Sequence, residues 1–247
     1  TASANTAMGS GAMGATTTGN QNTAIGSGAL GSNTNGSENT VLGYNALDAN
    51  TSGGSNVAVG KQALTANTTA SYNVAIGVDA MAANTTGNQN VVVGSLALDA
   101  NTTGIYNVAI GHLALSGNTT AGKNVAVGHA ALRFNSTGAN NVALGTNALT
   151  ANTTANQNVA VGYDALASTT TGAQNTAVGG YALDTNTTGE YNVAVRYAAM
   201  DASTTANHNT GVGYHALKAN TTGIRNVAVG AYAMDASQTS NYNVAVG

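Results

Sequence analysis

The sequence predicts an all-β parallel β-solenoid (β-roll), a fold in which the chain winds into stacked coils of equal length. Two observations predict it. Asn recurs every 17 residues from Asn5 to Asn243, and the residues between follow the consensus N-[VT]-A-[VI]-G-x-x-A-[LM]-x-x-N-T-T-G-x-x. Seventeen residues are too few for a helical pair but suffice for two short strands and two turns. Positions of the repeat are numbered 1 to 17 from this Asn.

The first half of each repeat predicts a strand that ends in a turn. Val57 and Val59 flank Ala58, and this alternation predicts a short strand with its branched side chains facing inward. Position 5 is Gly in every repeat except one, where Arg196 replaces it. A recurrent Gly indicates a turn that needs positive φ or close backbone approach.

The second half of each repeat predicts a second strand. Position 8 is Ala in every full repeat and position 9 is Leu or Met, which suits a short strand with one large inward residue. Positions 12 to 15, as in Asn101–Gly104, read N-T-T-G and predict the second turn. We therefore expect 17-residue coils with two short strands per coil, about 14 of them in one array over residues 1–247.

Composition agrees with a thin coil and excludes several classes of function. The 247 residues include 32 Gly, no Cys, no Pro and no Trp, so bulky side chains are too scarce for a thick core. The net charge of −3 lacks the basic excess that nucleic-acid binding needs. No apolar run is long enough to span a bilayer. We expect no nucleic-acid partner and no membrane insertion in this segment.

A thin coil also predicts self-association. It buries little apolar area relative to the entropy lost on ordering the chain. The small Ala side chains at positions 3 and 8 are expected to form flat faces for contact between chains, giving a homotrimer or an end-to-end filament. Neither end carries the polar, atypical repeat that caps a solenoid, so we expect a segment of a longer chain.

The strand motif resembles a known family. The residues NVAVG at 124–128, and NVAIGxxA from Asn73 and Asn107, are similar to the head repeats of trimeric autotransporter adhesins, the YadA-like family, and to phage tail-fibre-like β-roll repeats. The resemblance implies left-handed coils packed as homotrimers, and a location outside the cell, on its surface or in a virion fibre. The present repeats are longer than the usual head repeat, and no heptad stalk accompanies them.

Two Asn columns are candidates for distinct roles. Asn at position 1 is expected to stack along the solenoid and hydrogen-bond through its amide. Position 12 begins an N-x-S/T sequon in nine repeats, which makes these residues candidate glycosylation sites, although N-T-T-G is also good turn chemistry. The nine are Asn50, Asn67, Asn84, Asn101, Asn118, Asn135, Asn152, Asn186 and Asn220.

Tyr is the most informative variable residue. It recurs at positions 6 and 17, beside the turns that flank the first strand, where its ring would either stack on sugars or cover the turn. The candidate ligand-facing residues are Tyr44, Tyr72, Tyr106, Tyr163, Tyr191, Tyr197, Tyr214 and Tyr242.

No set of residues predicts catalysis. His112 and His129 share position 6 in successive repeats, but no carboxylate completes a metal site. Among the Asp residues at position 10, only Asp184 and Asp201 lie in adjacent repeats. We expect no enzyme activity, no catalytic or metal-binding residue and no cofactor.

The sequence therefore predicts a structural and adhesive segment of an extracellular fibre or filament, whose partners are its own copies and a host surface or glycan. The alternative is an ice-binding or carbohydrate-binding solenoid. Thr recurs at positions 13 and 14, but adjacent residues of an extended chain point to opposite faces, which leaves one Thr row per face.

Overall fold

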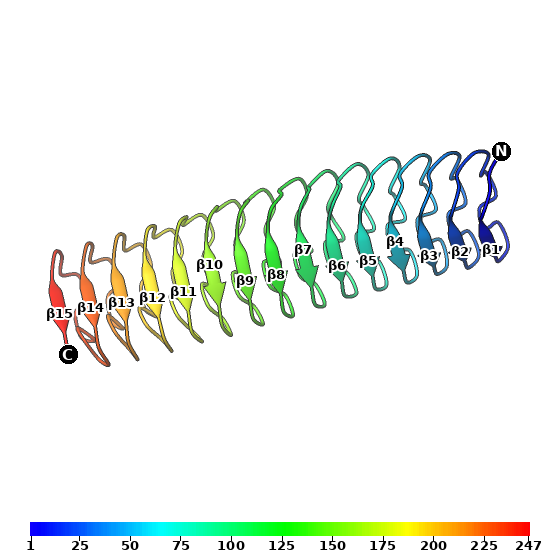
Figure 1. Cartoon of the computed structure of the whole chain (residues 1–247). Helices are drawn as coiled ribbons and strands as arrows, with labels where there is room; N and C mark the ends of the chain where they lie inside the picture. Colours follow the sequence, from blue (N-terminus) through cyan, green and yellow to red (C-terminus); the bar gives the residue numbers. More distant parts are fainter. The chain divides into compact units, whose positions relative to one another are not determined.

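The computed structural model describes all residues, 1–247, and confirms a parallel β-solenoid with one coil per 17-residue repeat. It forms two compact units, Thr1–Lys123 and Asn124–Gly247, each of which is a stack of coils (Figure 1). The structure has no helix, and therefore no helix long and apolar enough to cross a membrane.

Each coil contributes one three-residue strand to a parallel sheet within its unit. Every strand residue pairs with the residue 17 positions further along, as in Val57 with Val74. The strands of the first unit are β1 (Thr6–Met8), β2 (Thr23–Ile25), β3 (Thr40–Leu42), β4 (Val57–Val59), β5 (Val74–Ile76), β6 (Val91–Val93) and β7 (Val108–Ile110). Those of the second unit are β8 (Val125–Val127), β9 (Val142–Leu144), β10 (Val159–Val161), β11 (Thr176–Val178), β12 (Val193–Val195), β13 (Thr210–Val212), β14 (Val227–Val229) and β15 (Val244–Val246).

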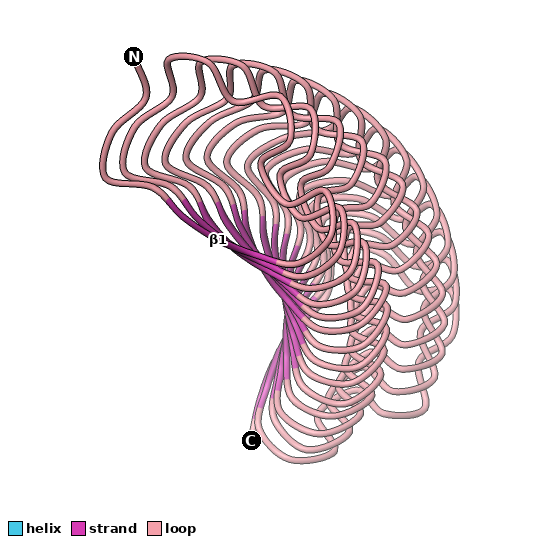
Figure 2. Cartoon of the chain, turned by 90° about the vertical axis from the view of Figure 1, so that its right-hand side faces the viewer, coloured by secondary structure: helices cyan, strands magenta, loops and turns pink.

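The predicted second strand is absent, and that prediction was wrong. Positions 6 to 11 form consecutive turns, so that strands occupy one side of each coil and loops the rest (Figure 2). Gln62 and Leu64, at positions 7 and 9, have φ of 57° and 54°, in the left-handed region that no strand contains. The amide of Ala63 donates to the carbonyl of Gly60 within the coil, while that of Leu64 donates to Ala80 of the next coil.

The coil interior is lined by small residues and one large one, and the predicted facing of the strand was also wrong. Ala58 and Leu64 are fully buried, whereas Val57 and Val59 are half-buried and face outward. The interior is narrow: a Cβ added to Gly211, at position 3, would lie 2.9 Å from Cγ of Met200 at position 9. The Ala columns therefore pack inside their own coil, and they are not the flat faces between chains that we expected.

The other part of the interior is polar and confirms the predicted Asn stack. Oδ1 of Asn56 accepts hydrogen bonds from the backbone N–H and Nδ2 of Asn73, at 3.0 and 3.4 Å, and its own Nδ2 donates to the carbonyl of Ala70 at 2.9 Å. Asn67, at position 12, donates from Nδ2 to Oδ1 of Asn50 at 3.0 Å and to the same Ala70 carbonyl at 3.1 Å. Two Asn columns thus tie each coil to its neighbours and close it at position 15.

We expect Asn56→Ala to lower the free energy of unfolding by about 2–4 kcal/mol, because it leaves the buried N–H of Asn73 without a partner and opens a cavity. Urea unfolding followed by circular dichroism measures this. Gln89→Ala, at an exposed position, is the matched control and should change stability by less than about 0.5 kcal/mol. Equal effects of the two substitutions would contradict the structural role of the Asn column.

The Gly column at position 5 confirms its predicted role. These residues have φ between 129° and 146°, a region that side chains rarely adopt. A Cβ on Gly94 would lie 2.5 Å from the carbonyl oxygen of Gly111 in the next coil. Arg196 is the exception: its φ is 101°, and its side chain is exposed. The backbone has shifted at this residue but remains strained.

Arg196→Gly is expected to raise the free energy of unfolding by about 1–2 kcal/mol, because Gly removes the strain of a side chain at this φ. Thermal unfolding at fixed protein concentration checks the sign. The reciprocal control is Gly162→Arg, which should destabilise, since its Cβ would lie 2.6 Å from the carbonyl carbon of Gly179. A lower melting temperature for Arg196→Gly would contradict the assignment of strain.

Candidate functional site

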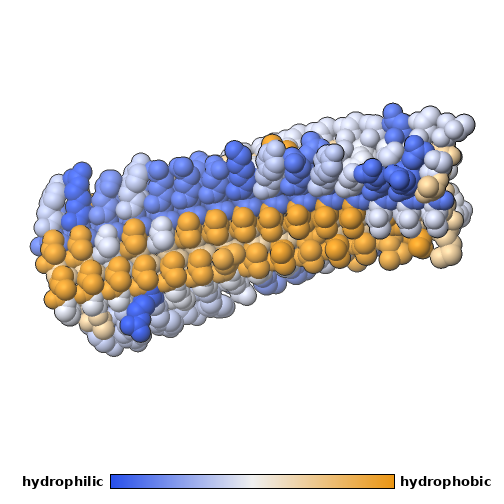
Figure 3. All heavy atoms as spheres, in the orientation of Figure 1, coloured by the Kyte–Doolittle hydropathy of each residue, from blue (hydrophilic) through white to orange (hydrophobic).

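The outward side of each sheet is an apolar surface. It arises because Ala at position 3 faces the coil interior, so the side chains on either side of it face outward. It consists of the side chains at positions 2 and 4 of every strand, all of them Val, Ile, Leu, Met or Thr, and we call it the apolar sheet face. Ile76 is 38% exposed, and Ile110 and Val178 are exposed to similar extents. Figure 3 shows these side chains as rows that cross the strands of each unit. No charged side chain interrupts them.

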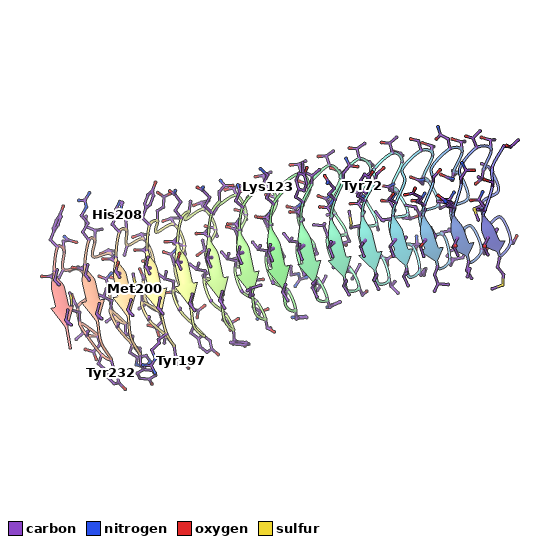
Figure 4. The ribbon with its side chains drawn as sticks, viewed as in Figure 1. Tyr72, Lys123, Tyr197, Met200, His208 and Tyr232 are labelled. Carbon is purple, nitrogen blue, oxygen red and sulfur yellow. The ribbon has the colours of Figure 1, made fainter.

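A second surface, in the second unit, is built from aromatic side chains at positions 6 and 7. We call it the aromatic strip; it comprises Tyr163, Tyr181, Tyr197, Tyr214, His215 and Tyr232. Neighbouring ring centroids lie close together, at 5.7 Å for Tyr181 and Tyr197 and 5.9 Å for Tyr197 and Tyr214. Figure 4 places Tyr197 and Tyr232 on the same edge of this unit, and His208 on the opposite edge.

The local backbone explains how the strip forms. Position 6 follows the turn at position 5, and position 7 is in the left-handed region, as Tyr181 (φ 58°) and Tyr232 (φ 60°) show. Coils of a parallel stack are about 4.8 Å apart, so rings from successive coils fall within contact distance. Tyr197 is 50% exposed, which leaves part of its ring accessible to a ligand.

A hollow of about 440 Å³ lies beside the strip. Four ring-bearing residues of the strip line it together with three charged residues at position 10; the whole lining is Tyr181, Asp184, Tyr197, Ala198, Asp201, Tyr214, His215 and Lys218. Asp184, Asp201 and Lys218 also line an adjoining hollow of about 350 Å³. The surface therefore joins aromatic rings, two carboxylates and an ammonium group.

The two carboxylates share a partly desolvated environment. Burial raises the pKa of Asp184, and the negative charges of Asp164 and Asp201 raise it further. Burial also raises the pKa of Asp201, although Lys218 and His215 act in the opposite direction. Because these carboxylates are not fully solvated, they are available to accept hydrogen bonds from hydroxyl or N–H groups of a ligand.

Asp184→Asn is expected to raise the melting temperature at pH 7, because the folded state no longer holds a poorly solvated charge. The pKa of Asp184 is higher in the folded state, so the penalty develops as pH rises through the ordinary Asp pKa and is absent below it. Melting curves from pH 3 to pH 7 should show a gain of a few degrees at most that disappears in acid. A gain independent of pH would contradict this cause.

The predicted Tyr residues divide into three groups. Tyr163, Tyr197 and Tyr214 belong to the strip, whereas Tyr44, Tyr72 and Tyr106 of the first unit are exposed and have no aromatic neighbour. At position 17 of the second unit, Tyr191 stacks on His208 at 4.8 Å, and the hydroxyl of Tyr242 accepts a hydrogen bond from Nη1 of Arg225 at 2.7 Å.

Tyr181, His215 and Tyr232, which complete the strip from position 7, were not predicted from the sequence. Tyr is rare in the position-7 column when that column is taken alone. The available signal was the occurrence of aromatic residues at position 6 or 7 in five consecutive repeats, because neighbouring columns lie side by side in a stack.

The nine sequon asparagines are fully buried, which argues against their glycosylation in the folded chain. Nδ2 of Asn101, for example, donates hydrogen bonds to Asn84 and to the Gly104 carbonyl inside the coil. A glycan on this nitrogen would prevent the coil from closing. The residues concerned are Asn50, Asn67, Asn84, Asn101, Asn118, Asn135, Asn152, Asn186 and Asn220.

The Thr columns and the acidic residues supply no further site. Hydroxyls at position 13 donate to the next coil, as from Thr68 to the carbonyl of Thr85 at 3.2 Å, so only the position-14 row is free to face solvent. No three His, Asp or Glu side chains gather closely enough to hold a metal ion.

Comparisons of this chain with protein-family models, with curated proteins and with solved structures find no match. The apolar sheet face and the aromatic strip are therefore the features that bear on its function.

Proposed function

We propose that this chain is a non-catalytic structural segment of an extracellular fibre, that its copies associate through the apolar sheet face, and that side chains outside this face serve adhesion. The apolar sheet face is the observation that carries the proposal. Water-exposed rows of Val and Ile without charges are uncommon on monomeric proteins and are typical of surfaces that other molecules cover.

The size of the face fits association between copies. Three residues at about 3.3 Å and seven or eight strands at about 4.8 Å give about 330–380 Å² in each unit. The areas of the two units add up to about 710 Å² per chain, near the roughly 800 Å² that each partner contributes to a standard interface. A second copy presents the same flat, regularly spaced rows, so it is the partner that matches this face in both periodicity and polarity.

The number of copies and the hand of the coil follow from the resemblance to YadA-like head repeats. We propose three copies around a common axis, with left-handed coils. The apolar sheet face lies on one side of every coil. A closed ring of three chains around a common axis would therefore cover this face in each chain. The same resemblance supports a location on a cell surface or a virion fibre. The uniformity of the coils, in which the same Asn, Gly, Ala and Leu or Met columns recur, supports a structural role.

The double substitution Ile76→Lys and Val178→Lys places one charge on the apolar sheet face of each unit. Both side chains are 38% exposed, so the coils should still fold, but a buried unpaired ammonium group is incompatible with the interface. Sedimentation equilibrium of the unmodified chain should give three times 24.1 kDa, and the variant should sediment as a monomer.

The matched control is Thr86→Lys with Thr188→Lys, which adds the same charge at exposed position-14 residues outside the sheet face. It should sediment as the unmodified chain does. A monomeric unmodified chain would overturn the proposal of self-association, and a stable dimer would overturn the proposed trimer alone.

A further inference from the structure

The aromatic strip and the charged residues beside it have a composition suited to one class of ligand. We infer that they bind a neutral polysaccharide that lies along the stack direction of the second unit. The inference rests on the adhesive part of the proposed function and is independent of self-association. It names the ligand class that this edge of the solenoid would take.

The spacing of the rings carries the first step. The strip spans five consecutive repeats, from Tyr163 to Tyr232, with successive ring centroids 5.3 to 5.9 Å apart. Coils recur about every 4.8 Å, which is close to the length of one sugar ring in an extended polysaccharide. Successive sugars would therefore meet successive rings. Three of the four successive Tyr pairs are edge-to-face, with interplanar angles of 69° to 78°, so the strip offers ring edges as well as the exposed parts of ring faces. Both surfaces can contact the apolar C–H groups of a pyranose.

The hollow beside the rings carries the second step. Its volume of about 440 Å³ lies within the range of ligand sites, and it combines an aromatic wall with a few convergent polar groups. Asp184 and Asp201 can accept hydrogen bonds from sugar hydroxyls, and Lys218 can donate them. Hydroxyl groups are both donors and acceptors, so several of them on one ligand can satisfy all three groups.

The charges distinguish among ligands that aromatic surfaces accept. Two carboxylates disfavour an acidic polysaccharide, because its charges would face Asp184 and Asp201. A linear polyamine would gain from these carboxylates, but it would also meet the like charge of Lys218. Two carboxylates and one ammonium group suit a neutral ligand whose hydroxyl groups donate to Asp184 and Asp201 and accept from Lys218.

The strip also lies outside the apolar sheet face. Its residues occupy positions 6 and 7, and the charged residues beside it occupy position 10; all of these follow the strand, whereas the apolar sheet face consists of positions 2 and 4. Chains that associate through their sheets would leave this edge open to a polysaccharide.

Tyrosine fluorescence gives a direct test, because the chain has 10 Tyr and no Trp, and five of the Tyr are in the strip. The full chain is titrated with cello-, chito- and malto-oligosaccharides, with polygalacturonate as an acidic probe and spermidine as a cationic one. We expect saturable binding of at least one neutral oligosaccharide, confirmed by calorimetry. Tyr197→Ala with Tyr214→Ala should weaken it by at least about tenfold, as loss of aromatic anchors does in other interfaces.

Two further variants keep the result interpretable. Tyr72→Ala with Tyr106→Ala removes two exposed rings of the first unit that have no aromatic neighbour, and should leave the affinity unchanged. Tyr197→Phe with Tyr214→Phe retains the rings and should bind within a few-fold of the unmodified chain. Melting temperatures show that each variant is folded.

The inference is overturned if no neutral oligosaccharide binds, if only polygalacturonate or spermidine binds, or if the first-unit variant loses as much affinity as the strip variant. Sedimentation of the same samples separates this outcome from the failure of self-association. Absent saccharide binding in a chain that still self-associates would refute the ligand class and leave the structural proposal standing.

Discussion

Each coil depends on the coils beside it through a register of 17 residues that never shifts within a unit. Strand hydrogen bonds, many turn amides and the Oδ1 atoms of the position-1 Asn column pair with groups in the neighbouring coil. A single coil would therefore leave many of its polar groups without partners, and its interior of Ala, one Leu or Met and two Asn is too small to be stable alone. Gly is favoured at position 5 for the same reason, because a Cβ at the φ of this column would meet the carbonyl group of the next coil, and Arg196 is accommodated only with a shifted φ of 101°.

Because each coil depends on its neighbours, much of the fold can be predicted from the sequence. A constraint that acts on every coil produces an invariant column, and so Gly94 and Asn56 could be assigned their roles from periodicity alone. The facing of the strand could not, because Ala58 and its flanking Val residues are all apolar and alternation has no preferred phase between them. Nor could the turns at positions 6 to 11, because residues such as Leu64 adopt a left-handed conformation that propensity assigns to Gly or Asn.

The candidate sites differ in how far the sequence could reveal them. The apolar sheet face is made of conspicuous residues, but it was expected in the interior, and only the structure places it outside. For the aromatic strip, Tyr residues at position 6 were correctly expected at the surface, but their contacts with one another were not predicted. These contacts join two adjacent columns, as between Tyr181 and Tyr197. Invariant columns thus indicate the residues that build every coil, and variable columns indicate where one part of the stack carries a different surface.

The contact between Met200 and Gly211 has a consequence for how the chain finds its correct pairing. Coils of nearly identical sequence are interchangeable, so a folding chain can skip one repeat and still satisfy most of its hydrogen bonds. Gly211 places no side chain in the interior at position 3, and the preceding coil carries Met200, which is longer than the usual Leu. A Cβ on Gly211 would lie 2.9 Å from the Met200 side chain. If one repeat were skipped, Met200 would face a different residue at position 3. This pairing distinguishes one pair of coils from the rest of the array, in which Met81 by contrast precedes Val92, and it favours the native alignment at this point.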